Sequence, residues 1–88
     1  MALFSITYDL VENKDYDSLI DRLKELDTVK VQLSQWFLAA NNTAKEIKDD
    51  LAACMDDDDK LMVVEFSKRP QFTRAFKGTN EWLKNHFG

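Results

Sequence analysis

The spacing of apolar side chains switches between the period of a strand and that of a helix several times within residues 1–66, and this order of periods is what most constrains the fold. Residues 2–9 alternate, with an apolar set on one side and a more polar set on the other. Residues 13–26 then place apolar side chains at helical spacing, with charged residues between them. The pattern predicts a half-buried strand followed by an amphipathic helix, with Asn13 or Asp15 as the N-cap of that helix.

Residues 29–40 alternate again and predict a second extended segment. Fully extended, this segment would span about 40 Å, which is too long for so small a sheet. A bend, a bulge or a switch of sheet is therefore expected at Ser34-Gln35. A second helix follows, because residues 43–46, TAKE, have the form of a capping box. Residues 61–66, LMVVEF, are rich in β-branched side chains and predict a further strand.

The predicted order within residues 1–66 is strand, helix, strand, strand, helix, strand. This order is typical of the α+β ferredoxin-like arrangement βαββαβ, in which an antiparallel sheet carries both helices on one face. Residues 67–88 form a separate C-terminal tail, and Thr79 or Asn80 is the expected N-cap of a short helix within it. We expect the tail to pack on the sheet or on a dimer partner, because its aromatic side chains need cover.

Charge is divided unevenly along the chain, whose formal net charge is −4. Residues 1–66 carry 7 Lys and Arg against 15 Asp and Glu, whereas residues 67–88 carry 5 against 1. An acidic body with a basic tail predicts either contact between the two or a polyanionic partner for the tail. A chain of 88 residues has a thin core, which favours a homodimer that covers a further face.

Several patterns of known chemistry are missing from the sequence. It contains no catalytic triad, P-loop, zinc-ligand spacing or dinucleotide-binding fingerprint. Cys54 falls in a helical pattern and is interpreted as a core residue, and His86 is interpreted as an incidental residue near the C-terminus. No apolar stretch approaches the roughly 18 residues of a membrane helix, and no secretory leader is recognisable. We expect a cytoplasmic protein with no membrane partner.

Asp9 is the candidate catalytic and metal-binding residue. It ends the first predicted strand on the same face as Ser5 and Thr7, and a carboxylate there suits a Mg²⁺ ion that keeps several of its waters. One carboxylate makes a poor cage. A twofold axis through this face would bring two Asp9 side chains together, and a metal between them would remove their repulsion. The other interpretation is that Asp9 caps the strand end or forms a local salt bridge.

The segment KRPQFTRAFK, residues 68–77 and hereafter the basic segment, is the candidate nucleic-acid-binding region. Cations neutralise phosphates, and aromatic rings stack on unpaired bases. The residues expected to make these contacts are Lys68, Arg69, Phe72, Arg74 and Lys77. The other interpretation is a connector whose phenylalanines pack and whose charges meet the acidic body. That body would also repel a long duplex lying across it.

The stretches LFSITYDL and VKVQLSQWF together resemble the small CRISPR-associated Cas-two proteins and their relatives among the VapD-type toxin ribonucleases. The resemblance covers about residues 1–66. It rests on Tyr8-Asp9 at the strand end, on residues 31–34, VQLS, and on the acidic turn that leads into strand 61–66. It implies a ferredoxin-like homodimer that binds nucleic acid, often with C-terminal segments crossing to the partner. In some members it also implies a Mg²⁺-dependent ribonuclease or deoxyribonuclease with Asp9 as metal ligand.

Two functions from different classes follow from these patterns. The first is a Cas-two-like dimeric protein that binds RNA or DNA, with or without Mg²⁺-dependent endonuclease activity at Asp9. The second is a non-catalytic regulatory module that binds a protein partner through its sheet face and tail. Salt dependence separates the two, because neutralisation of phosphates predicts an affinity for nucleic acid that falls steeply with salt.

Overall fold

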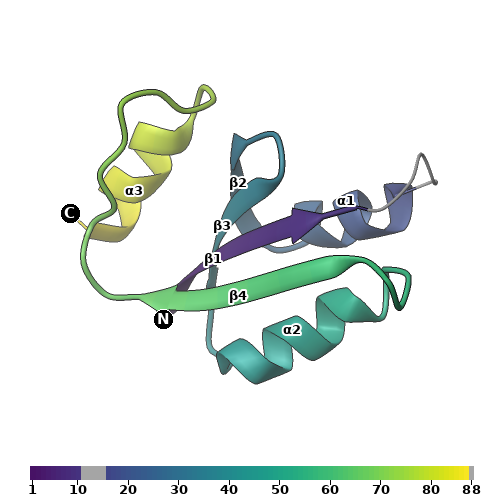
Figure 1. Ribbon diagram of the computed structural model, residues 1–88. Coiled ribbons are helices and arrows are strands. Elements are labelled where there is room, and N and C mark those ends of the chain that lie inside the picture. The colour runs from purple at the N-terminus through teal and green to yellow at the C-terminus, as the bar shows by residue number, and fades with distance from the viewer. Residues whose placement is uncertain (11–15, 88) are drawn as a thin grey trace.

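The computed structural model describes residues 1–10 and 16–87 (Figure 1). The predicted order of strands and helices is confirmed, and a third helix follows the last strand. The N-cap predicted at Asn13 or Asp15 lies outside the described residues. The elements are β1 (Ala2–Asp9), α1 (Asp17–Lys24), β2 (Asp27–Gln32), β3 (Gln35–Ala40), α2 (Ala44–Ala52), β4 (Lys60–Phe66) and α3 (Thr79–Phe87).

The four strands form one antiparallel sheet in the order β2-β3-β1-β4. The central strand β1 pairs with β3 on one side, where Phe4 lies opposite Leu38, and with β4 on the other, where Asp9 lies opposite Lys60. The strands β2 and β4 are therefore the two edges. A small α+β structure with this sheet is compatible with the expected ferredoxin-like arrangement.

Helices α1 and α2 cover one face of the sheet, as the alternation of β1 predicts (Figure 1). Each helix buries one apolar stripe, with Leu19 and Leu23 on α1 and Ile47 and Leu51 on α2. These side chains pack against the strand residues Phe4, Ile6, Tyr8, Trp36 and Leu38. Helix α2 begins at the predicted capping box, where Thr43 Oγ1 accepts from Glu46 N at 3.1 Å and Glu46 Oε1 accepts from Thr43 N at 2.9 Å.

The opposite face of the sheet, hereafter the open face, carries Leu3, Ser5, Thr7 and Asp9 on β1. Helix α3 covers only part of it (Figure 1), burying Trp82 and Leu83 in a second core. The strand residues of this second core are Leu3, Val31, Phe37 and Ala39. The part of the open face that α3 leaves uncovered lies over β4 and the C-terminal end of β1, near Asp9.

The long extended segment 29–40 is divided by a hairpin turn at Leu33-Ser34, so that Gln32 pairs with Gln35. The expected bend therefore lies one residue earlier than Ser34-Gln35. The pairing of β2 with β3 is irregular between Lys30 and Gln32, as a bulge would make it.

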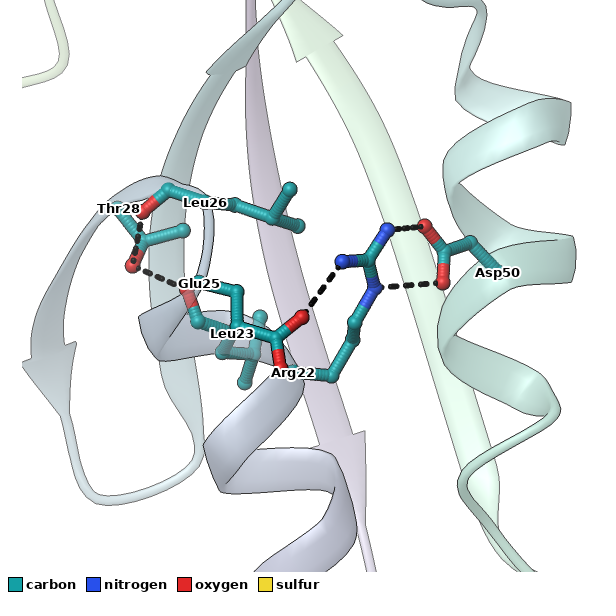
Figure 2. A network of polar contacts seen from close by, with 6 residues as sticks. All are labelled: Arg22, Leu23, Glu25, Leu26, Thr28 and Asp50. Atoms are coloured by element: carbon teal, nitrogen blue, oxygen red, sulfur yellow. Dashed lines mark hydrogen bonds and ion pairs between the residues drawn. The ribbon is translucent and has the colours of Figure 1, made fainter.

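Arg22 ties α1 to α2 (Figure 2). Its Nε and Nη2 donate to the two carboxylate oxygens of Asp50 at 3.0 and 2.7 Å, and its Nη1 donates to Glu25 at 2.8 Å. A forked contact of this kind holds the guanidinium in one orientation. Beside it, Thr28 Oγ1 donates to the carbonyl oxygen of Leu23 at 2.8 Å and closes the turn from α1 into β2. Arg22 is thus engaged in contacts that hold α1 and α2 together.

Candidate nucleic-acid interface

The basic segment runs from the end of β4 to the start of α3 and passes the outer edge of β2. At that edge the backbone N–H of Phe76 donates to the carbonyl oxygen of Val31 at 3.0 Å. The segment is followed directly by Gly78, whose φ of +98° is a conformation that residues with a side chain rarely adopt. This turn directs the chain into α3 and so determines where the preceding cations lie.

A half-enclosed cavity of about 410 Å³, hereafter the first cavity, lies between the open face and the basic segment. Its apolar wall includes Phe37 and Phe66, whose ring centroids are 5.1 Å apart. Lys68 and Phe72 line it from the basic segment. The remaining lining residues are mainly small or polar, namely Ser5, Val31, Gln32, Gln35, Pro70, Gln71, Ala75 and Thr79.

A shallower groove of about 390 Å³, hereafter the second cavity, adjoins the first. The two share Val31, Gln32 and Ala75 in their linings. Arg74 and Phe76 line the second cavity from the basic segment. Each cavity is therefore lined by one cation and one exposed phenylalanine of the same segment, Phe72 at 41% and Phe76 at 44% exposure.

The five residues predicted to bind nucleic acid are all exposed, but they do not form one cluster. Lys68 and Phe72 line the first cavity, and Arg74 lines the second. Arg69 points elsewhere, because its Nη2 donates to Asn80 Oδ1 on α3 at 2.6 Å. Lys77 is exposed just before the turn into α3. Along the segment, each of the two cavities is thus lined by one predicted cation and one phenylalanine.

Asp9 lies at the solvent-exposed end of β1, where 77% of its side chain is accessible. Among the described residues, it forms an ion pair with Lys60 on the paired strand, with Nζ 4.0 Å from Oδ2. A shallow depression of about 420 Å³ beside it is lined by Thr7, Tyr8, Asp9, Lys60, Leu61 and Met62. The contact with Lys60 is the local salt bridge that the sequence left open as the alternative.

The donor set around Asp9 does not by itself make a magnesium site. Within residues 1–10 and 16–87, no three His, Cys, Asp or Glu side chains come together as metal ligands would. One carboxylate beside an ammonium group offers a Mg²⁺ ion a single anionic ligand. A second Asp9 from a partner subunit would be needed, so the metal role remains a prediction.

Exposed apolar side chains lie on the uncovered part of the open face. Met62 is 62% and Val64 50% exposed, and they pair with Thr7 and Ser5 of β1. Such a row on an edge strand is a surface that commonly contacts another chain.

The residues that place α3 were not predicted from the sequence. Asp27 accepts from the indole Nε1 of Trp82 at 2.9 Å, and its Oδ2 is 3.1 Å from Nε2 of His86. His86, interpreted from the sequence as incidental, therefore contacts β2. Gln32 and Gln35 were likewise not predicted as cavity residues. Their position on either side of a predicted strand break was the one available signal, since hairpin ends commonly line binding surfaces.

No known protein-family model matches the chain. None of the helices within residues 1–10 and 16–87 has the length and apolar character that a membrane-spanning helix needs.

Proposed function

We propose that this chain is a cytoplasmic, ferredoxin-like protein that binds nucleic acid through its basic segment, acting as a homodimer related to the Cas-two group. The observation that carries the proposal is that Lys68 and Phe72 line one cavity and Arg74 and Phe76 line the cavity that adjoins it. Cations beside exposed rings are the combination that binds phosphates and unpaired bases together.

The acidic body supports single strands over duplexes as the ligand. Residues 1–66 carry 15 Asp and Glu against 7 Lys and Arg, so a duplex lying across the sheet would meet repulsion. The basic segment is a narrow strip at one edge, and a flexible single strand follows such a strip with less contact to the rest of the surface.

The homodimer is proposed on the exposed apolar residues of β4. Met62 and Val64 lie on the uncovered part of the open face beside Asp9, and a second copy would cover them. A twofold axis there would also bring two Asp9 carboxylates near each other. Hydrolysis of the bound strand with Mg²⁺ is proposed only in that dimer, since Asp9 is the single carboxylate among the described residues that line the adjacent depression of each protomer.

The alternative function is a non-catalytic module that binds a protein. The specific observation in its favour is that the same two exposed apolar residues, Met62 and Val64, lie on β4, which is an edge strand of the sheet. A peptide from a partner could add a strand at this edge, a known mode of recognition.

The test is binding of labelled single-stranded RNA, single-stranded DNA and duplex DNA, measured by fluorescence anisotropy over a range of salt. Four phosphate contacts to a single strand predict a slope of about −3 in log K against log salt. The variant with Lys68, Arg69, Arg74 and Lys77 all changed to glutamine is expected to lose this binding. A matched variant that removes four cations elsewhere, Lys24, Lys45, Lys48 and Lys84, is expected to keep it. Absence of binding to every ligand at the lowest salt would favour the protein-binding module.

A further inference from the structure

We propose that the first cavity takes one unpaired nucleobase and that the second cavity takes the neighbouring base of the same strand. This inference rests on the proposed function, because it names the part of the nucleic acid that the basic segment recognises. Four features of the cavities support it: their rings, their amide groups, their charge and their continuity.

The rings provide stacking surface. Phe37 and Phe66 form the inner wall of the first cavity, with their planes tilted by 57°. Phe72 lines the same cavity from the basic segment and remains 41% exposed. An exposed ring beside a buried aromatic wall can receive the flat face of a base, and every base has such a face.

The amide groups provide hydrogen bonds for the edge of a base. Gln32, Gln35 and Gln71 all line the first cavity. Gln35 is held in place, because its Nε2 donates to Ser5 Oγ at 2.8 Å. That bond uses one N–H of the amide and leaves its carbonyl oxygen as an acceptor. A side chain that offers donor and acceptor together matches the paired groups on a base edge.

The charge of the cavity selects a neutral or anionic ligand. Among the described residues that line the two cavities, none is acidic, although the body of the protein is rich in carboxylates. Lys68 provides the cation of the first cavity and Arg74 that of the second. A nucleotide has an uncharged base and an anionic phosphate, and both parts suit this lining.

The shared wall provides continuity between neighbouring bases. Val31, Gln32 and Ala75 line both cavities, so the two cavities adjoin each other along these residues. In the second cavity Phe76 is 44% exposed, and its ring lies 5.9 Å from Lys30 Nζ. A volume of about 410 Å³ in the first cavity is in the range of small-ligand sites. A base paired within a duplex cannot enter such a pocket.

The experiment compares two oligonucleotides of equal length and charge, one with bases and one abasic, against the full chain. Wild type is expected to bind the base-bearing strand more tightly. Phe72→Ala is expected to weaken that binding about 5- to 150-fold, as loss of stacking on one base does, and to leave binding of the abasic strand unchanged. Lys84→Gln, on α3 away from the cavities, is the control and is expected to alter neither. Circular dichroism verifies that each variant is folded.

A second variant tests the amide contact. Gln35→Leu keeps the approximate shape of the side chain and removes its donor and acceptor. It is expected to change the ratio of affinities for oligo-adenylate and oligo-cytidylate, whereas Phe72→Ala lowers both affinities. An unchanged ratio would overturn the edge contact.

Failure of the cavity and failure of the proposed function give different results. If wild type binds the abasic and base-bearing strands equally, phosphate binding stands and the base pockets are overturned. If it binds neither strand, the proposed function fails. The pocket is then tested by itself, by adding millimolar adenosine monophosphate to ¹⁵N-labelled protein and recording the NMR signals of the side-chain amides. Shifts of the Gln35 and Gln71 side-chain amides would then sustain the nucleotide pocket alone, and unchanged amides would overturn it too.

Discussion

Trp82 donates its indole Nε1–H to Oδ1 of Asp27 at 2.9 Å and so joins the last helix to the first residue of β2, 55 positions earlier in the chain. The other carboxylate oxygen of Asp27 lies 3.1 Å from Nε2 of His86, whose ring centroid is 4.3 Å from that of Trp82. Asp27 thus receives two side chains from successive turns of α3. The basic segment is fastened at its C-terminal end by this helix, so these contacts also position the proposed interface.

Trp82→Phe is expected to lower the free energy of unfolding by about 1 kcal/mol, since the phenyl ring keeps most of the apolar burial and loses the hydrogen bond to Asp27. Urea denaturation followed by circular dichroism measures the change. Lys84→Ala, on the exposed side of the same helix, is the control and is expected to have little effect. Equal stability of Trp82→Phe and wild type would mean that the hydrogen bond contributes nothing net to docking of α3.

Thr43→Ala is expected to lower the free energy of unfolding by about 1 kcal/mol, because the capping box of α2 loses the acceptor for the Glu46 N–H. Thr43→Ser keeps that acceptor and is expected to retain most of the stability. Thr73→Ala, at an exposed site in the basic segment, is the matched control. A cost for Thr43→Ser as large as that for Thr43→Ala would contradict the capping explanation.

The contact between Arg22 and Asp50 predicts a dependence on pH. Hydrogen bonding to the guanidinium, with its charge, holds the pKa of the Asp50 carboxyl below its usual value. Because that pKa is lower in the folded than in the unfolded chain, the pair contributes stability above the unfolded pKa. This contribution is lost as the pH falls through the folded pKa. Solvent exposure of the pair keeps the contribution small.

Arg22→Gln is expected to raise the pKa of Asp50 toward its usual value, which a ¹³C NMR titration of the side-chain carboxyl groups measures directly. The neighbouring Asp49 is an internal control, because Lys48 and Lys45 lower its pKa to about 2. Its titration is expected to be unchanged in the variant. A parallel rise in both carboxyl groups would point to a general change in α2 instead of loss of one contact.

Asp9→Ala is expected to abolish any Mg²⁺- or Mn²⁺-dependent cleavage of labelled single-stranded RNA or duplex DNA while leaving the oligomeric state intact. The reason is that Asp9 is exposed beside the uncovered part of the open face and is the carboxylate proposed to hold the metal there. Asp57→Ala, in the exposed acidic turn before β4, is the matched control. Equal cutting by wild type and Asp9→Ala would assign the activity to another site or a contaminant.

Met62→Lys is expected to weaken self-association roughly tenfold or more, because it replaces an apolar side chain of the proposed dimer face with an ammonium group that loses its hydration when that face is covered. Sedimentation equilibrium at micromolar concentration measures the effect. Leu33→Lys, at the tip of the β2–β3 hairpin and 78% exposed, is the control and is expected to leave the dimer intact. A monomeric wild type would remove both the proposed dimer and the metal site that depends on it.

The sequence by itself determined the order of the elements and one helix start. The alternation of β1, the helical stripes of α1 and α2, and the capping box at Thr43 each depend on residues within about four positions of one another. Such relationships are already present in the local chain, whatever its distant parts do. The charge contrast between body and tail is likewise a property of composition.

Only the tertiary structure decided where the site lies. Arg22 pairs with Asp50 28 positions away, and Gln35 with Ser5 30 positions away. The first cavity exists because residues of all four strands, the basic segment and the start of α3 converge on it. Periodicity states which side of an element is apolar, but it does not state which other element covers that side. Helix α3 docks on only part of the open face and is held there by its contact with Asp27. Because it covers no more, Asp9 and Met62 remain exposed, and the cavity beside Phe72 forms between the sheet and the basic segment.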